Sequence, residues 1–118
     1  MARATLTVYV GDLNGVAVTE TTGTADDIEF VNTGKEVLIV RNTDAGGAHT
    51  YTILGKGTSS WGADTADEAC SVALSGMNVH ANIETSRFNT TGGKVEIDLE
   101  GGEEEHFELS VVKAQDVS

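Results

Sequence analysis

The segment IETSRFNTTGGKVEIDL, residues 83–99, indicates the class of fold. In its second half the apolar residues Val95, Ile97 and Leu99 alternate with charged residues. Successive side chains of a β-strand point to opposite faces, so this alternation places all three apolar side chains on one face. The segment therefore predicts a strand with one buried face, preceded by a polar corner that contains a double glycine.

Alternation of the same kind extends in both directions from this segment. No sufficiently long segment has the three-and-four spacing of an amphipathic helix. Short strands separated by turns rich in Gly, Asn, Asp and Thr are typical of antiparallel sandwiches and small barrels. The sequence therefore predicts an all-β fold, an antiparallel jelly-roll-like sandwich or small barrel of about eight strands. The predicted strands are residues 5–10, a segment that begins with Ile28 and Phe30, and residues 36–42, 48–54, 70–75, 77–83, 94–99 and 106–112.

Two of these strands carry further expectations. The run EVLIVRN, residues 36–42, is apolar on both faces, which is typical of a strand buried on both sides. In MNVHANI, residues 77–83, alternation puts Met77 and Val79 on the face that is expected to be buried, and His80 on the other face.

The length of 118 residues is enough for one domain and too short for two, so residues 1–118 are expected to form a single β domain. The chain has one cysteine, Cys70, and therefore no internal disulfide. Its first residues, MARATLTVYVG, lack the apolar run of a signal peptide, and no segment is apolar enough to span a membrane. We expect the protein to be made and folded in a cytoplasm.

The charge balance limits the partners. Nineteen acidic residues outnumber seven basic ones, which gives a formal net charge of −12. Proteins bind nucleic acids largely by neutralising phosphates with Lys and Arg, so neither nucleic acid nor an anionic membrane is an expected partner. The acidity is consistent with simple solubility. It also resembles the acidic surfaces of proteins from salt-loving microbes, where repulsion is screened within about 3 Å at 1 M salt. Both interpretations stay open.

The residues that could bind a metal do not form a recognised motif. Two His, one Cys and one Met form blue-copper sites on β-sandwiches, and the chain has His49, His80, His106, Cys70 and Met77. In such sites the ligands near the C-terminus follow the order Cys, His, Met. Here Met77 precedes His80, so the order does not match. These histidines are expected at or near the surface, and the cysteine is expected to be a small core residue.

The acidic turns DTADE, residues 64–68, and EEE, residues 103–105, lack the spacing and the central glycine of a calcium loop, so they are expected to be solvated turns. No nucleophile, metalloprotease or phosphate-loop motif is present. The sequence therefore predicts no catalytic residue, no metal and no cofactor.

The segments DDIEFVNTGK (residues 26–35), VRN (40–42), TYTI (50–53) and RFNTTGGKVEI (87–97) follow one another in an order that resembles capsid decoration or head stabilisation proteins of tailed viruses, which infect bacteria or archaea. Such proteins have a D-x-x-F-x-N-x-G-K motif, an apolar strand that ends in a basic residue and Asn, a T-x-T-I strand, and an R-F-N segment before a G-x-V-x-I strand. The similarity covers roughly residues 26–99, but the chain lacks the family's usual prolines. The matching positions are Phe30, Asn32, Gly34, Lys35, Arg41, Asn42, Thr50, Thr52, Ile53, Gly76, Arg87, Phe88, Asn89, Gly93, Val95 and Ile97.

The resemblance implies a structural virion protein and not an enzyme. Such a protein binds the outside of an icosahedral head and cements neighbouring major capsid proteins, commonly as a homotrimer. Its location would be the outer capsid surface, after synthesis in the host cytoplasm. Two alternatives remain: another virion component on the same fold, such as a head-tail adaptor or spike base, or a non-viral β-sandwich binding module.

Five residues receive specific roles. Leu6 and Val8 are expected to contact the capsid from an N-terminal strand or arm of residues 1–10. Trp61, the only tryptophan, either folds back to cap the core or anchors an interface, because interface energy concentrates in Trp, Tyr and Arg. Arg87 is expected at the rim, paired with a carboxylate of its own or a neighbouring chain. Phe88 is expected to turn inward and close one end of the sandwich.

Overall fold

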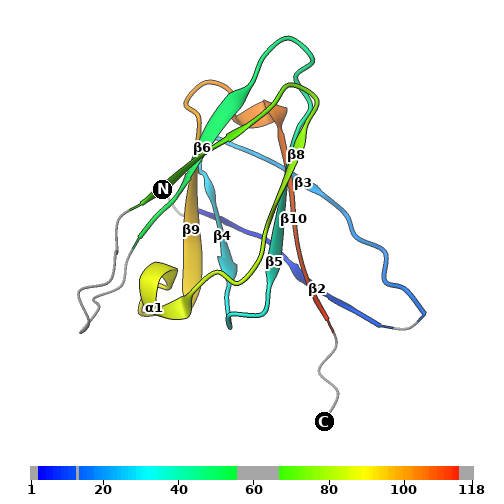
Figure 1. Cartoon of the computed structure of the whole chain (residues 1–118), viewed down its shortest axis with the longest axis vertical. Helices are drawn as coiled ribbons and strands as arrows, with labels where there is room; N and C mark the ends of the chain where they lie inside the picture. Colours follow the sequence, from blue (N-terminus) through cyan, green and yellow to red (C-terminus); the bar gives the residue numbers. More distant parts are fainter. Residues whose placement is uncertain (1–2, 13, 56–66, 115–118) are drawn as a thin grey trace.

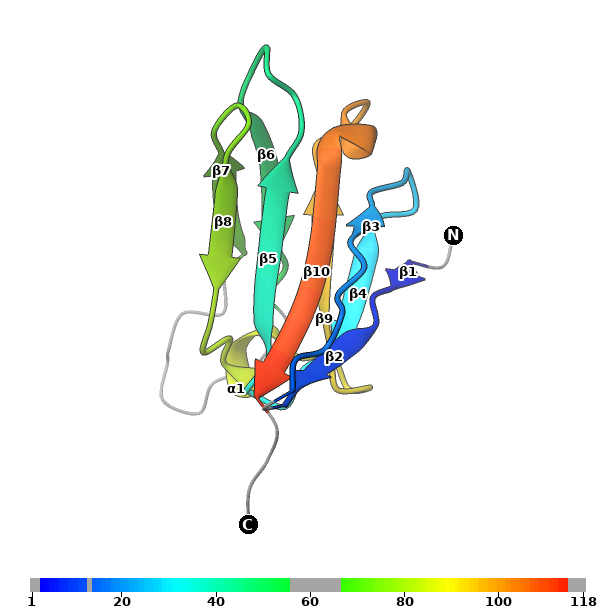
Figure 2. The same ribbon diagram turned by 90° about the vertical axis from the view of Figure 1, so that its right-hand side faces the viewer.

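The computed structural model describes residues 3–12, 14–55 and 67–114, and within them it is an all-β sandwich of two mixed sheets (Figures 1 and 2). None of the described helices is long and apolar enough to cross a membrane. The strands are β1 (Ala4–Thr5), β2 (Val8–Gly11), β3 (Thr21–Thr22), β4 (Ile28–Val31), β5 (Val37–Asn42), β6 (His49–Ile53), β7 (Glu68–Val72), β8 (Met77–His80), β9 (Lys94–Leu99) and β10 (Phe107–Ala114).

Two short helical turns complete the described elements: α1 (Thr85–Phe88) and a 3-10 turn, η1 (Glu104–His106). They lie at opposite ends of the sandwich, with α1 beside the start of β9 and η1 between β9 and β10 (Figure 1).

Sheet A has the strand order β1-β4-β9-β6-β7, and sheet B has the order β2-β10-β5-β8, with β3 also paired to β10. Figure 2 views the molecule onto sheet B, with β8, β5 and β10 in front of sheet A. Consecutive strands often lie in different sheets, so the chain crosses repeatedly between the two layers. In the described pairing each sheet keeps two edge strands, so the small-barrel alternative is wrong and the sandwich is open.

The core forms between the facing sides of the two sheets. In β5 and β9 alternate residues are buried, as their sequence alternation predicts. In β10 the apolar residues Phe107, Leu109 and Val111 are buried, and so is Ser110 between them. The buried hydrophobic residues form one cluster, centred on the aromatic rings of Phe30, Tyr51 and Phe107. The edge-to-face contact of Tyr51 with Phe107 joins strands of opposite sheets, with ring centroids 6.0 Å apart.

Two details of the predicted sandwich are wrong. The pairs β1–β4 and β2–β10 are parallel, so the sheets are mixed and not purely antiparallel. Strand β5 is buried on one face only: Leu38 and Val40 are fully buried, whereas Val37 and Ile39 are half-buried because no described layer covers the outside of sheet B. The apolar residues on both faces of this segment predict a strand packed between two layers. In the described residues only sheet A packs against β5.

The N-terminal segment is part of the fold. Residues 5–10 were predicted as one strand, but the chain leaves sheet A after β1 and joins sheet B at β2. Leu6 lies between these two strands, and its side chain is buried in the core with 3% exposure. Its backbone N–H donates to the Glu29 carbonyl at 2.8 Å. The described residues 3–10 are therefore part of the two sheets and not a free arm, and the capsid contact expected for the N-terminal strand or arm of residues 1–10 stays a prediction.

Deletion of residues 2–8 is expected to lower stability by at least about 3 kcal/mol, because it removes a buried leucine together with the pairing of β1 and part of β2. Chemical denaturation of the deleted and full chains measures this loss. A deleted chain with an unchanged unfolding midpoint would show that the segment is an independent arm after all.

Candidate functional site

The outside of sheet B carries an apolar surface whose most exposed part is the edge strand β8. Met77 and Val79 are 57% and 60% exposed. The polar residues Asn78 and His80 of the same strand face inward, where Asn78 Nδ2 donates to the Tyr51 hydroxyl at 3.0 Å. The prediction that Met77 and Val79 lie on a buried face is therefore wrong: the apolar side of β8 faces outward.

Neighbouring strands extend this surface across the sheet. Directly paired residues of neighbouring strands lie on the same face of a sheet. Ile39 of β5 pairs with Val79, and Val37 of β5 pairs with Val112 of β10, so these half-buried apolar side chains also lie on the outside of sheet B. We call this set the outer face of sheet B. Its members are Tyr9, Val37, Ile39, Met77, Val79 and Val112.

One border of the outer face is polar and held in place. Arg41 pairs with Met77 across the ladder, and its guanidinium makes two bonds to Glu20, at 2.8 and 3.0 Å. This bidentate pair raises the pKa of Arg41 and lowers the pKa of Glu20. An apolar centre with a charged border is the usual composition of a protein contact surface.

Behind the outer face, the inward residues of β8 form a small polar contact with the core. His80 Nε2 makes a short hydrogen bond with the Tyr51 hydroxyl, and the two rings meet edge to face. Burial lowers the pKa of His80, and the carboxylate of Glu68 opposes this effect. Burial also raises the pKa of Tyr51 to about 12, so both groups are neutral near pH 7.

This histidine predicts a pH dependence. Because the pKa of His80 is lower in the folded chain than its ordinary value of 6.5, the unfolded chain takes up a proton first as the pH falls. The contribution of neutral His80 to the free energy of unfolding is therefore complete above about pH 6.5. It falls as the pH is lowered further, by no more than about 1.4 kcal/mol per pH unit. Relative to His80→Asn, the wild type should lose stability between about pH 7 and pH 5 in denaturation experiments. Parallel pH profiles of the two proteins would contradict this assignment.

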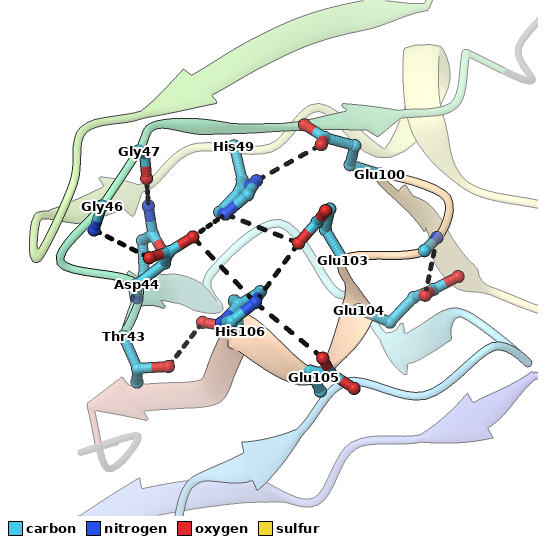
Figure 3. A network of polar contacts seen from close by, with 12 residues as sticks. Thr43, Asp44, Gly46, Gly47, His49, Glu100, Glu103, Glu104, Glu105 and His106 are labelled. Atoms are coloured by element: carbon cyan, nitrogen blue, oxygen red, sulfur yellow. Dashed lines mark hydrogen bonds and ion pairs between the residues drawn. The ribbon is translucent and has the colours of Figure 1, made fainter.

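A second constellation lies at the end of the sandwich opposite α1, where the β5–β6 loop meets the β9–β10 connection (Figures 1 and 3). His49 Nε2 lies 2.7 Å from Asp44 Oδ2, and His106 Nε2 lies 3.2 Å from Glu103 Oε2. The two imidazole rings are stacked, with centroids 5.1 Å apart. We call Asp44, His49, Glu103 and His106 the histidine–carboxylate cluster; one ligand atom of each lies within 4.8 Å of those of the others.

The backbone positions each member of this cluster. His49 is the first residue of β6, and the alternation of β6 turns its side chain inward to 7% exposure. Asp44 is held by the Gly46 backbone N–H, which donates to its Oδ1 at 2.8 Å. The backbone N–H and hydroxyl of Thr43 both donate to the His106 carbonyl, which fixes η1 against the β5–β6 loop.

Mutual charge stabilisation dominates the cluster. The bond to Asp44 raises the pKa of His49, against the opposing effect of burial. The pKa of Asp44 is lowered by the Gly46 backbone N–H and by His49, and the pKa of Glu100 is lowered by the Thr50 backbone N–H and by His49. Two imidazoles and several carboxylates can share protons or hold a cation.

The sequence pattern does not indicate this cluster, and it predicts each histidine separately at or near the surface. The local signals were present, since Asp44 precedes His49 by five positions and Glu103 precedes His106 by three. Neither pair is a metal motif alone, and the fold brings the two pairs together. His80 and Met77 lie elsewhere, on β8, and Cys70 is half-buried against the core.

The polar corner before β9 is organised by buried side chains. Phe88, at the end of α1, belongs to the core cluster and is 7% exposed. The Arg87 guanidinium lies over the Phe88 ring, 4.5 Å from its centroid, and contacts Glu68 of its own chain at 3.3 Å. Asn32 Nδ2 donates to the Asn89 Oδ1 at 2.8 Å, and Asn89 Nδ2 donates back to the Asn32 carbonyl at 2.7 Å.

The other expected interface residues lie as follows. Leu6 is a core residue, and Val8 is half-buried and packs against the core. Their burial follows from the pairing of the N-terminal segment with both sheets. Trp61 lies outside the described residues.

Ion pairs among the described residues offset only a fraction of the negative charge. Arg3 contacts Asp98 at 2.7 Å and Lys94 contacts Glu29 at 2.8 Å, yet the whole chain has nineteen acidic and seven basic residues. Repulsion among the remaining carboxylates opposes the compact state and is screened by salt.

Stability is therefore expected to increase with salt. The melting temperature in about 2 M potassium chloride should exceed that in about 0.1 M by roughly 5 °C or more. Chloride is preferable to sulfate, because sulfate strengthens apolar burial by exclusion. A flat or falling melting temperature would leave the acidity as an aid to solubility only.

Comparison with known proteins gives no relative: no protein-family model, no curated protein and no solved structure matches this chain.

Proposed function

We propose that the protein is a capsid decoration protein, which binds the outside of an icosahedral tailed-virus head and cements neighbouring major capsid proteins. The proposal rests on the outer face of sheet B, and above all on β8, whose apolar side chains face outward. Within the described residues, Met77 and Val79 point to solvent while Asn78 and His80 point to the core. Exposed apolar side chains grouped in this way are typical of a contact with another protein.

The shell is the occupant that we assign to this face. A second copy of the chain also carries a net charge of −12, so face-to-face pairing of two copies is opposed by repulsion. A different protein surface avoids that cost. The resemblance to decoration proteins supplies the identity of that partner, and the jelly-roll-like description and the homotrimer belong to the same proposal.

The positions that carry the resemblance support a structural role. Asn32 and Asn89 bond each other at the corner before β9, and Asn42 is 1% exposed and donates to the Gly47 carbonyl at 2.9 Å. These asparagines fix loops by satisfying buried backbone groups. The similar motifs therefore coincide with residues that determine the fold of this chain.

The mechanism is mass action. A protein that binds only the assembled shell stabilises the shell relative to its free subunits. Many copies, each held through a modest apolar contact, act together because neighbouring contacts raise the effective concentration. No catalytic step is required.

Imaging of virus heads with and without this protein tests the proposal. A decoration protein should appear at hundreds of positions on the outer surface, and heads without it should break at lower temperature or force. About a dozen copies at one vertex would instead indicate a head-tail adaptor or spike base. Absence from purified particles would contradict a virion role and favour a non-viral binding module.

A further inference from the structure

We propose that the histidine–carboxylate cluster binds one divalent transition-metal ion, of the class for which Zn²⁺ is the natural probe. Its ligands would be Nε2 of His49 and His106 and one carboxylate oxygen each of Asp44 and Glu103 (Figure 3). This site is separate from the outer face of sheet B and does not depend on the proposed function.

The spacing of the donor atoms suits a small ion. A tetrahedral ion with ligand distances of ~2.0–2.1 Å separates its ligands by roughly 3.3 Å. The separation of Nε2 from the nearer carboxylate oxygen is 2.7 Å at His49 and 3.2 Å at His106. Each Nε2 also lies near the carboxylate of the other pair: His49 Nε2 is 3.9 Å from Glu103 Oε2, and His106 Nε2 is 4.0 Å from Asp44 Oδ2. Four donors from two separate loops are therefore already close to the required distances.

A further carboxylate supports the more buried histidine from behind. His49 Nδ1 lies 3.3 Å from Glu100 Oε2, so this ring nitrogen can donate its proton to Glu100 while Nε2 faces the cluster. Metal-bound histidines usually donate their second ring N–H to such an acceptor, which fixes the tautomer and the orientation of the ring. Glu100 is itself fixed by the Thr50 backbone N–H, which donates to its Oε1 at 2.9 Å.

Binding requires one ring to turn. A metal lies in the plane of each imidazole that binds it, whereas the rings of His49 and His106 are nearly parallel, at 4°. His49 is held by Glu100 and by burial, and the His106 side chain is 31% exposed. Rotation of His106 about its side-chain bonds is therefore the adjustment that brings both nitrogens onto one ion.

The ligand chemistry selects the class of metal. Imidazole nitrogens favour Zn²⁺ and its transition-metal neighbours, whereas Ca²⁺ and Mg²⁺ favour sets made only of oxygen. Carboxylates surround the two rings, since Glu105 also lies 3.9 Å from His106 Nε2. A dication is thus attracted by local charge and held by the nitrogens.

The ion would join distant parts of the sandwich. Asp44 and His49 flank the loop that leads from sheet B to sheet A, and Glu103 and His106 belong to the connection that returns to sheet B. A ligand that binds only the folded chain stabilises it in proportion to the logarithm of its concentration. At about 100 times the dissociation constant, Zn²⁺ should raise the melting temperature by roughly 10 °C.

Titration of the EDTA-treated full chain with zinc chloride, followed by calorimetry, tests the site. We expect one ion per chain, and at least about tenfold weaker binding in each of His106→Gln and Glu103→Gln. Glu84→Gln removes an exposed carboxylate at the other end of the sandwich, and this control should bind zinc as the wild type does.

Cobalt(II) provides a measurement that needs no variant. A four-coordinate nitrogen–oxygen site on the wild-type chain should give strong visible absorption that zinc then removes. The proposal is overturned if no saturable binding of one ion occurs. It is also overturned if both cluster variants bind like the wild type, or if Glu84→Gln weakens binding as much as they do, since the ions would then be adventitious counter-ions only.

Discussion

Replacement of Asn32 by Asp is expected to lower the free energy of unfolding by about 3–5 kcal/mol near pH 7. Asn32 is 3% exposed, and its Nδ2 donates to the Ile83 carbonyl at 3.0 Å and to Asn89 Oδ1 at 2.8 Å. Its Oδ1 accepts from the Gly34 backbone N–H at 3.0 Å. The substitution keeps the shape and the acceptor, but it removes both donors and places a negative charge against two oxygens.

The chemistry of the introduced carboxyl gives a diagnostic pH dependence. Burial among acceptors raises its pKa, so the ionised form carries most of the destabilisation and the loss should shrink on acidification. Urea denaturation of Asn32→Asp and wild type at about pH 7 and pH 5 measures both effects. Asn14→Asp makes the same chemical change in an exposed loop and should stay within about 0.5 kcal/mol of wild type. A comparably small loss for Asn32→Asp would contradict the bonding assigned to this corner.

Replacement of Phe88 by Ala is the second large effect, with an expected loss of about 3 kcal/mol or more. The ring fills the end of the core beside α1 and is 7% exposed, so its removal leaves a cavity that the strands cannot close. Since native domains hold only about 5–15 kcal/mol, this variant should melt well below the wild type.

Arg87→Ala is the matched control for the same corner. Its ion pair with Glu68 is partly exposed to solvent, and its stacking on Phe88 adds a modest attraction, so the expected loss is about 1 kcal/mol or less. Equal losses for Arg87→Ala and Phe88→Ala would show that the corner is held by the arginine and not by the buried ring.

The sequence predicted the strands more successfully than their environment. Alternation identified the residues that share a face in β6 and β9, because the side-chain period of a strand is local. It could not determine which face of β8 points inward. That choice depends on Tyr51, which lies on another strand and offers its hydroxyl to Asn78 and His80.

The clusters were harder to predict for a related reason. His49 and His106 are separated by almost half the chain, and they meet because β6 and β10 begin at the same end of the sandwich. The alternation of residues 5–10 likewise predicts one strand, whereas the chain passes from sheet A to sheet B at Leu6. Period and spacing report local geometry, and crossovers between sheets are decided by long-range packing.

Direct binding to heads that lack the protein tests the central claim, that the outer face of sheet B is the contact with the shell. The variant Met77→Gln/Val79→Thr keeps side-chain size and strand propensity but makes this face polar. Val31→Thr is the control, because Val31 is 46% exposed on β4 of sheet A. We predict that the double variant folds normally and binds heads at least about tenfold more weakly, while the control binds like the wild type. Equal binding by all three proteins would contradict the account.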